Sequence, residues 1–370
     1  MFTCVRSLIT SAVQTLSTSV RQEEHNEYAS SRPPSGGAPL WVLAELDSGS
    51  RGRKLVGMRL LCPAKINLHL RVGPRREDGF HPLLSWFCTA GLFDTLTLER
   101  SPQAGDRVTQ DAKPVIALSC DDMAVPCDER NLVVRVAQAW ALEARQSALG
   151  DIGPVTAALS KRIPAGAGLG GGSSDGARAL EGLNALWNTG RAADFLSGFA
   201  ARFGSDLPFF FHGPSSICSG RGEIVRRAPK PAAGWALIVL PAVVMPTPDV
   251  YRRFDEMGLG VSQDIDIEPD WEAWANLEAI DLLAELVNDL EPPAFEIAPE
   301  LRALRDGIEK TLGRPVRMSG SGSSLFTLFD SNAEARAART AVEHVHCVRC
   351  HAVELAPVLQ DDLNAGHGEK

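Results

Sequence analysis

Residues 164–175 read P-A-G-A-G-L-G-G-G-S-S-D, with five glycines between Gly166 and Gly172. Glycine has no Cβ, so such a loop permits positive φ angles and lets backbone N–H groups converge on one point. An apolar helical pattern, A-R-A-L-E-G-L-N-A-L-W, follows at 177–187. A loop that opens a helix adds unpaired amides and the positive end of the helix dipole. The stretch therefore predicts a polyphosphate site, where serine hydroxyls can bind phosphate or a Mg²⁺ ion.

Two common phosphate loops fit this stretch poorly. The P-loop pattern needs a lysine directly after the glycines, where this chain has Ser173 and Ser174. The dinucleotide pattern G-x-G-x-x-G is met formally, but a Rossmann turn should follow a buried apolar strand. Here the polar segment S-K-R-I-P at 160–164 precedes the loop. A flexible linker is disfavoured because a good helix follows at once. A dehydrogenase is therefore a weak alternative.

Further motifs occur along the chain in a characteristic order. They are P-A-K-I-N-L-H-L at 63–70, R-E-D-G-F-H-P-L at 76–83, G-S-D-L-P-F-F at 204–210, P-T-P-D-V-Y at 246–251, N-D-L-E-P at 288–292 and M-S-G-S-G-S-S at 318–324. With the glycine loop, this series resembles the GHMP family of small-molecule kinases. It is most similar to the branch that phosphorylates a cytidyl diphosphate sugar alcohol in the non-mevalonate route to isoprenoids. The likeness covers roughly residues 58–355. All GHMP kinases share the glycine loop, whereas P-A-K-x-N-L and D-G-F-H are specific to the branch.

The resemblance implies an α+β fold of two domains. The N-terminal domain would be of the ribosomal-protein-S5-like kind and the C-terminal domain ferredoxin-like. We expect them at 58–227 and 235–357, separated by the linker A-P-K-P-A-A-G at 228–234. The residues alone indicate only two α+β units. Residues 358–370 are expected to form a disordered tail.

Hydrophobic periodicity predicts the individual elements within these units. Strands are expected at 92–99, 115–119, 235–244, 325–329 and 347–355, and helices at 131–148, 175–187, 271–287 and 299–312.

The first 57 residues carry none of the motifs. They are rich in Ser, Thr and Arg, and the first 21 contain no Asp or Glu, which is typical of an organelle transit peptide. The segment M-R-L-L-C-P-A-K at 58–65, however, reads as the starting strand of such an enzyme. We therefore interpret residues 1–57 as a disordered N-terminal extension, or the product of a start codon assigned too early, in preference to a targeting signal.

Composition excludes several classes of protein. The net charge of −9 over 370 residues argues against a general nucleic-acid binder. The best apolar run, residues 235–244, is too short for a membrane span. Eight scattered cysteines suit a reducing cytoplasm. The cluster H-C-V-R-C-H at 346–351 has no second cluster to complete a zinc site, so we predict no metal held by protein ligands. We expect a cytoplasmic monomer or weak homodimer.

Phosphoryl transfer needs a phosphate cradle, cations and a group that orients or deprotonates the attacking hydroxyl. Lys65 lies in an apolar strand pattern, where its ammonium needs a partner or must reach water. Asp206, on the residues alone, is equally well a turn or helix-capping residue. The resemblance implies that Lys65 and Asp206 are the catalytic pair. Asp206 would then be the base, while Lys65 holds it and offsets negative charge.

The resemblance also implies ATP and Mg²⁺ as cofactors and a cytidyl diphosphate sugar alcohol as substrate. Asn67 and Thr247 would bind its erythritol part, Phe80 and Tyr251 would stack on the cytosine, and His81 would read the cytosine edge. On the residues alone, Phe80 and His81 read better as a core residue and a turn residue. Tyr is more usual where Phe80 stands, and stacking survives that change. The ATP-binding residues would be Pro164, Ala165, Gly166, Ala167, Gly168, Leu169, Gly170, Gly171, Gly172, Ser173 and Ser174.

Two other functions stay open beside this one. Another GHMP kinase, acting on homoserine or a mevalonate-type substrate, is disfavoured by the pair Phe80-His81, because those substrates carry no base. A nucleotide-binding protein without turnover is disfavoured by the presence of both Lys65 and Asp206. The motif at 319–324 reads as a tight strand entry or a plain turn, and we assign it no direct role. Asn288, Asp289 and Glu291 are expected near the site from the resemblance alone.

Overall fold

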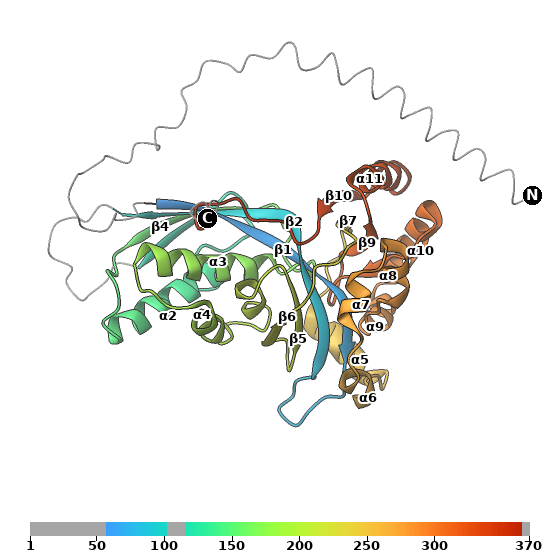
Figure 1. Cartoon of the computed structure of the whole chain (residues 1–370), viewed down its shortest axis with the longest axis horizontal. Helices are drawn as coiled ribbons and strands as arrows, with labels where there is room; N and C mark the ends of the chain where they lie inside the picture. The colour runs from blue at the N-terminus through green and yellow to red at the C-terminus, as the bar shows by residue number, and fades with distance from the viewer. Residues whose placement is uncertain (1–56, 102–114, 365–370) are drawn as a thin grey trace, which may run out of the picture. The chain divides into compact units, whose positions relative to one another are not determined.

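The computed structural model describes residues 57–101 and 115–364, which form two β-sheets with their helices (Figure 1). The N-terminal extension predicted at 1–57 lies outside the described residues, apart from Gly57. Residues 365–370 of the predicted C-terminal tail lie outside them as well.

The first sheet has the strand order β3-β4-β2-β5-β6, with β1 beside β2. Its long strand β2 pairs with β4 through its C-terminal half and with β5 through its N-terminal half. The pair β3 and β4 is parallel, and the other pairs are antiparallel. The strands are β1 Gly57–Val72, β2 Leu83–Arg100, β3 Ile116–Cys120, β4 Val155–Ser160, β5 Ser215–Ser219 and β6 Ile224–Arg227.

Helices α2 and α3 lie on the same side of this sheet (Figure 1) and bury Trp140 and Trp187 against it. The helices are α2 Leu132–Gln146, α3 Gly171–Leu186, α4 Ala193–Ala200 and the short 3₁₀ turn η1 Pro208–Phe211. Asn131 caps α2, since its side chain accepts a hydrogen bond from the amide of Val133 at 2.9 Å. The helix predicted from 131 is thus confirmed, whereas α3 starts before the predicted residue 175 because the glycines form its first turn.

The second sheet is antiparallel, with the order β10-β7-β9-β8. Its connectivity is the β-α-β-β-α-β of ferredoxin-like domains, enlarged by additional helices after the first strand. The strands are β7 Trp235–Leu240, β8 Arg317–Met318, β9 Leu325–Phe329 and β10 Arg349–Glu354. The helices are α5 Thr247–Glu256, α6 Ser262–Asp266, α7 Trp271–Ala275, α8 Ala279–Glu285, α9 Glu291–Ile297, α10 Pro299–Leu312 and α11 Asn332–His346.

The single helix predicted at 271–287 is wrong. The chain forms two short helices there, α7 and α8, with a break at residues 276–278. The first amide of α8, on Ala279, donates to the carboxylate of Asp330 at 2.9 Å. This cap comes from the end of β9, far along the sequence, so no local pattern announces the break. Strand β7 also ends earlier than predicted, at Leu240, because Pro241 follows.

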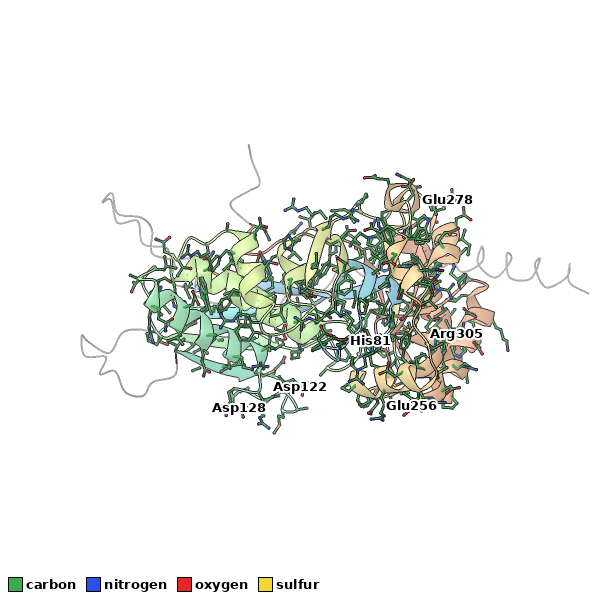
Figure 2. All side chains as sticks on the ribbon, turned by 90° about the horizontal axis from the view of Figure 1, so that it is seen from below. His81, Asp122, Asp128, Glu256, Glu278 and Arg305 are labelled. Atoms are coloured by element: carbon green, nitrogen blue, oxygen red, sulfur yellow. The ribbon has the colours of Figure 1, made fainter. Side chains whose placement is uncertain are left out.

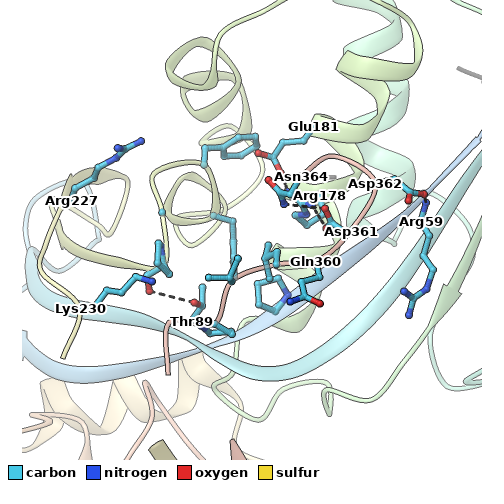
Figure 3. A pocket seen from close by; sticks show the side chains of 18 residues that line it. Arg59, Thr89, Arg178, Glu181, Arg227, Lys230, Gln360, Asp361, Asp362 and Asn364 are labelled. Atoms are coloured by element: carbon cyan, nitrogen blue, oxygen red, sulfur yellow. Dashed lines mark hydrogen bonds and ion pairs between the residues drawn. The ribbon is translucent and has the colours of Figure 1, made fainter. Parts of the chain in front are cut away.

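After β10 the chain returns to the first sheet, where Ala356 donates to the carbonyl of Thr89 at 2.9 Å. The buried carboxylate of Asp361 accepts from the amide of Leu61 at 3.1 Å and pairs with Arg178 of α3 (Figure 3). Residues that the sequence placed in a C-terminal tail therefore pack on this sheet as far as Asp362. A cavity of about 890 Å³ lies along this segment, and its lining includes none of the predicted site residues.

The structure also bears on cysteine pairing, metal-ligand clusters and membrane-spanning helices. In the two described ranges, all seven cysteines are free, and no group of three or more His, Cys, Asp or Glu could hold a metal ion. No helix in these ranges is both long and apolar enough to cross a bilayer.

His69, which is buried in β1, makes the stability of the fold depend on pH. It packs against Trp271 and Trp274, and its Nδ1 accepts from the amide of Val287 at 3.4 Å. Burial, with a smaller contribution from the charge of Arg71, lowers the pKa of His69 from 6.5 to about 3. The unfolded chain thus takes up this proton near pH 6.5 and the folded chain does not, so stability falls as pH falls below 6.5.

We predict that His69→Gln removes this part of the pH dependence, because glutamine keeps an acceptor but does not titrate. Between pH 7.5 and pH 5.0, the wild type should lose about 2 kcal/mol more unfolding free energy than the variant. Urea denaturation at the two pH values measures the difference. The exposed His344→Gln is the control and should lose as much as the wild type. Parallel losses in wild type and His69→Gln would contradict the prediction.

Candidate active site

One cavity of about 910 Å³ gathers the predicted site residues. All of them line it except Leu169 and Ser174, which are buried. The lining also includes four charged residues that the sequence did not single out, Arg75, Arg221, Arg252 and Asp255.

Lys65 and Asp206 meet in this cavity as an ion pair, with Nζ and Oδ2 3.5 Å apart. Lys65 is buried, so it does not reach water in the way that a surface lysine would. Its ammonium also donates to Asn67 Oδ1 at 2.6 Å and lies 4.8 Å from the centre of the Phe87 ring. The Asp206 side chain keeps 35% exposure. The pair therefore combines a fixed cation with a carboxylate that a ligand can reach.

Strand β1 is irregular on both sides of Lys65. Its pairing with β2 shifts between Pro63 and Ala64, and again between Asn67 and His69. Such bulges re-aim side chains, and they are frequent next to active sites. Lys65 and Asn67 are two residues apart and so face the same side of the strand. The amide of Lys65 donates to the carbonyl of Leu169 at 2.9 Å, which ties the strand to the glycine loop.

Asp206 lies between α4 and η1, and it caps neither. The residue before η1 is Leu207, and no side chain caps this turn. In the described part of the chain, the carboxylate of Asp206 has Lys65 as its ion-pair partner and accepts no backbone hydrogen bond. The alternative of a capping aspartate therefore finds no support in the geometry, although Asp206 does lie in a turn.

The glycine loop presents a row of open amides at the start of α3. Gly170 precedes the helix with a φ of 67°, a left-handed conformation that favours glycine. The first bond within the helix runs from the amide of Ser174 to the carbonyl of Gly170, at 2.9 Å. The amides of residues 171–173 precede it and have no partner within the helix. The buried hydroxyl of Ser174 also has no hydrogen-bond partner among the described residues. This arrangement fits an anion with an associated cation.

The second glycine motif, residues 318–324, packs directly against this loop. A Cβ on Gly168 would lie 2.2 Å from the carbonyl oxygen of Ser319, so only glycine fits there. The hydroxyl of Ser319 donates to the carbonyl of Gly168 at 3.0 Å, and the amide of Ser324 donates to that of Ala167 at 3.1 Å. The motif supports the loop through backbone contacts, a role that its sequence did not reveal.

A buried charge cluster lies on the other side of the loop. Lys161 pairs with Asp94 of β2 and with Asp175 of α3, the latter at 2.7 Å. Asp94 also accepts from the amide of Ile163 at 2.9 Å. Burial raises the pKa of Asp175 above its usual range. The cluster joins β2, the end of β4 and the first turn of α3, which explains the polar residues before the loop.

His81 is buried and faces Asp255 near the end of α5; Figure 2 labels His81 and Glu256, the last residue of that helix. Its Nδ1 donates to the carbonyl of Gly73 at 3.0 Å, and its Nε2 lies 3.2 Å from Asp255 Oδ1. Its ring centre is 5.2 Å from that of Tyr251. Only Nδ1 therefore makes a hydrogen bond within the described residues, while Nε2 faces a carboxylate, and the expectation that His81 reads a base edge stays a prediction.

The rings expected to stack on a base differ in burial. Phe80 is 50% exposed, which is unusual for a large apolar side chain and argues against core packing. Tyr251 is half-buried on α5, and burial raises the pKa of its hydroxyl to about 12. Both line the cavity, so a planar ligand can contact them.

The remaining predicted residues reach the cavity or the backbone behind it. The hydroxyls of Thr247 and Ser321 are 2.7 Å apart, and Asn67 Nδ2 donates to Ser85 at 3.0 Å. Asn288 Nδ2 donates to the carbonyls of Met318 and Gly320, at 2.7 and 2.8 Å. Asn288 therefore supports the second glycine motif from behind, since it does not line the cavity.

Comparison with known proteins identifies the family of this chain. The chain matches the models of the GHMP kinases N terminal domain at residues 131–214 and of the GHMP kinases C terminal at 270–346. It is 38% identical over 290 residues to the 4-diphosphocytidyl-2-C-methyl-D-erythritol kinase of Synechococcus sp. (strain CC9605), covering 75% of this chain and 89% of that protein. The protein of the same name from Prochlorococcus marinus (strain MIT 9313) is 40% identical, covering 75% and 85%.

Solved structures of kinases are also similar to this chain. A crystal structure of 4-(cytidine 5'-diphospho)-2C-methyl-D-erythritol kinase is 35% identical, with a TM-score of 0.63, and the match covers 81% of this chain and all of that one. A homoserine kinase from Cytophaga hutchinsonii shares the fold at 17% identity and a TM-score of 0.56, covering 85% and 98%. The predicted two-domain α+β kinase fold is thus confirmed, and the chain belongs to the GHMP kinase family, in its 4-diphosphocytidyl-2-C-methyl-D-erythritol kinase branch.

Proposed function

We propose that this protein transfers the γ-phosphate of ATP to the 2-hydroxyl of 4-diphosphocytidyl-2-C-methyl-D-erythritol, in the non-mevalonate route to isopentenyl diphosphate. The observation that carries the proposal is the Lys65–Asp206 pair in the same cavity as the glycine loop and the Phe80 ring. Curated relatives with this name, at 38 to 40% identity, support the choice of substrate.

Asp206 acts as the general base in this proposal. Its partly exposed carboxylate accepts the proton of the attacking hydroxyl, which makes that oxygen a better nucleophile. Lys65 holds the carboxylate in place and offsets the negative charge that develops as the phosphoryl group moves. Because its ammonium is already fixed by Asn67, little reorganisation is needed during the reaction.

The glycine loop holds the phosphates of ATP. The open amides of residues 171–173 donate to phosphate oxygens at the positive end of α3. The unpartnered hydroxyl of Ser174 is a suitable oxygen ligand for Mg²⁺. The Mg²⁺ ion, when bound, neutralises part of the charge on the phosphates.

The cytidine part binds at Phe80 and Tyr251, whose rings stack on the base. His81 acts indirectly in this proposal. Its Nδ1 donates to the carbonyl of Gly73 and its Nε2 faces Asp255, which holds the Phe80-His81 segment in place. The edge of the base is then left to the main-chain groups of this segment. Asn67 and Thr247 contact the methylerythritol part in this proposal.

Enzyme assays separate this proposal from its alternatives. Purified protein with ATP and Mg²⁺ should form ADP in the presence of the cytidyl substrate, and not with homoserine or mevalonate. ADP formation with homoserine or mevalonate instead would favour another GHMP kinase. ATP binding without turnover of any of the three would favour a nucleotide-binding protein.

The cellular compartment and the oligomeric state of the protein stay predictions. We keep a cytoplasmic monomer or weak homodimer, with no nucleic-acid or membrane partner. The relative from Mentha piperita, 34% identical over 320 residues, is named chloroplastic, so a plastid is the alternative compartment.

The first prediction from the proposed function concerns the glycine loop. Gly170→Val should abolish measurable ATP binding while the fold persists. A β-branched residue resists the positive φ, and its Cβ would lie 2.9 Å from Lys65 Cγ. Nucleotide titration of the folded variant tests this. Gly198→Val in α4, where a Cβ meets nothing within 4 Å, is the matched control and should bind ATP normally. Normal ATP binding by Gly170→Val would remove the loop assignment.

The second prediction concerns the base. Asp206→Asn keeps the size of the side chain and removes its basicity, so kcat should fall by roughly 10²–10⁴ with little change in KM. Steady-state kinetics with both substrates measures this. Asp194→Asn, exposed on α4, should keep the wild-type kcat. A near-normal kcat in Asp206→Asn would overturn the assignment of the base.

The third prediction concerns recognition. His81→Ala releases the segment that carries Phe80 from Gly73 and Asp255, so the KM for the cytidyl substrate should rise. The affinity for ATP should stay nearly unchanged, because His81 does not contact the glycine loop. Asp255→Asn should raise the same KM to a smaller extent. An unchanged KM in His81→Ala would overturn the anchoring role of His81.

A further inference from the structure

The proposed substrate sets a geometric condition on the cavity. Its covalent order is base, ribose, diphosphate and methylerythritol. If the proposed function holds, the base lies at Phe80 and Tyr251, and the acceptor hydroxyl lies at Asp206. The diphosphate must then lie between these two points, and a group there has to meet its negative charge.

Arg221, in the turn between β5 and β6, occupies such a position. Its guanidinium carbon lies 4.7 Å from the centre of the Phe80 ring, so it adjoins the base end. The next residue, Gly222, packs against the segment that carries Asp206, since a Cβ there would lie 3.3 Å from Ser205 Cβ. Arg221 and Ser205 both line the cavity. The turn therefore borders both ends of the substrate path.

The terminal nitrogens of Arg221 are available to a ligand. The two other arginines that line the cavity, Arg75 and Arg252, each use a terminal nitrogen to pair with an aspartate, at 3.7 and 3.0 Å. Arg221 approaches Glu223 through its Nε, at 3.6 Å. Its terminal Nη groups donate no hydrogen bond to any residue within 57–101 or 115–364. With 40% of its side chain exposed, the guanidinium can meet a ligand.

The backbone of this turn is held in place. The carbonyl of Gly220 accepts from the amide of Leu83 at 2.9 Å, which anchors the turn close to the His81 segment. The amide of Arg221 donates to Glu223 Oε2 at 2.6 Å, and that of Gly222 to the carbonyl of Ser219 at 3.0 Å. A side chain on a fixed turn loses less freedom when it binds a ligand.

We infer that Arg221 and its turn form a binding subsite for the diphosphate of the cytidyl substrate. The planar fork of the guanidinium donates two parallel hydrogen bonds to phosphate oxygens, while its face stays on the Phe80 ring. The subsite favours a nucleoside diphosphate over a nucleoside or a plain polyol. ATP also carries phosphates, so a test has to separate the two sources.

The experiment compares CDP with cytidine as probes, by calorimetric titration of the full chain. Arg221→Met keeps an unbranched side chain and removes the fork. CDP affinity should fall about 10- to 100-fold, while cytidine affinity changes by less than about threefold. In kinetics, the KM for the cytidyl substrate should rise by a similar factor, with the KM for ATP unchanged. Arg221→Lys, which keeps the charge, should recover part of the CDP affinity.

A matched control lies on the same hairpin. Arg226 of β6 pairs with Glu268 and does not line the cavity, so Arg226→Met should change neither affinity. Unchanged unfolding temperatures show that the variants are folded. If Arg221→Met does not fold, Arg221→Lys carries the test, and a wild-type CDP affinity in it would overturn the subsite.

Three outcomes would count against the inference. Equal losses of cytidine and CDP affinity in Arg221→Met would make Arg221 a support for Phe80 and overturn the subsite. A rise in the KM for ATP alone would assign Arg221 to ATP, with the same consequence. A wild-type protein that binds neither cytidine nor CDP would overturn the proposed function itself, and the subsite with it.

Discussion

The buried ammonium of Lys65 is the constraint on which the rest of the site depends. An unpaired charge in a protein interior is strongly destabilising, so the fold has to bring partners to it. Asn67 comes from the same strand, Asp206 from the segment before η1, and the Phe87 ring from β2. Asn67 and Asp206 also take part in the proposed chemistry. Because Lys65 needs such partners in order to be buried, folding also assembles the proposed catalytic pair.

Close backbone contacts at glycines pack the neighbouring segments around Lys65. Gly170 lies against the Lys65 side chain, and Gly168 lies against the backbone of Ser319. A Cβ on Gly320 would lie 3.1 Å from Asn67 Oδ1. The glycine loop, β1 and the second glycine motif therefore touch where side chains would keep them apart. The loop needs glycines twice over, for its left-handed turn and for this packing.

The parts of the structure that local sequence determines could be predicted, and the parts that distant contacts determine could not. Helix α10 runs from Pro299 to Leu312 as predicted, because proline at its start and Gly313 after its end are local signals. The break between α7 and α8 depends on Asp330, which lies beyond the local pattern. The glycine loop was visible as a motif, whereas its support by residues 318–324 was not.

The same distinction applies to the candidate site. Family resemblance named Lys65, Asp206, Phe80 and Tyr251, and the fold places them in one cavity. It could not show that the ring of His81 donates to Gly73 and faces Asp255, because the second contact depends on how α5 packs. Arg221 carried no signal either, since an arginine between two glycines reads only as a turn residue.

Chemistry and recognition lie on different elements of this fold. The proposed chemistry uses β1, the glycine loop and Asp206, which are bound to one another through the buried Lys65. The proposed recognition uses the β1–β2 connection, α5 and the β5–β6 turn, where Phe80 and Arg221 are substantially exposed. Exposed residues on connections can change with little effect on the core, because they stabilise it weakly. Changes at these connections can therefore alter the proposed recognition in this protein while Lys65 and its partners stay in place.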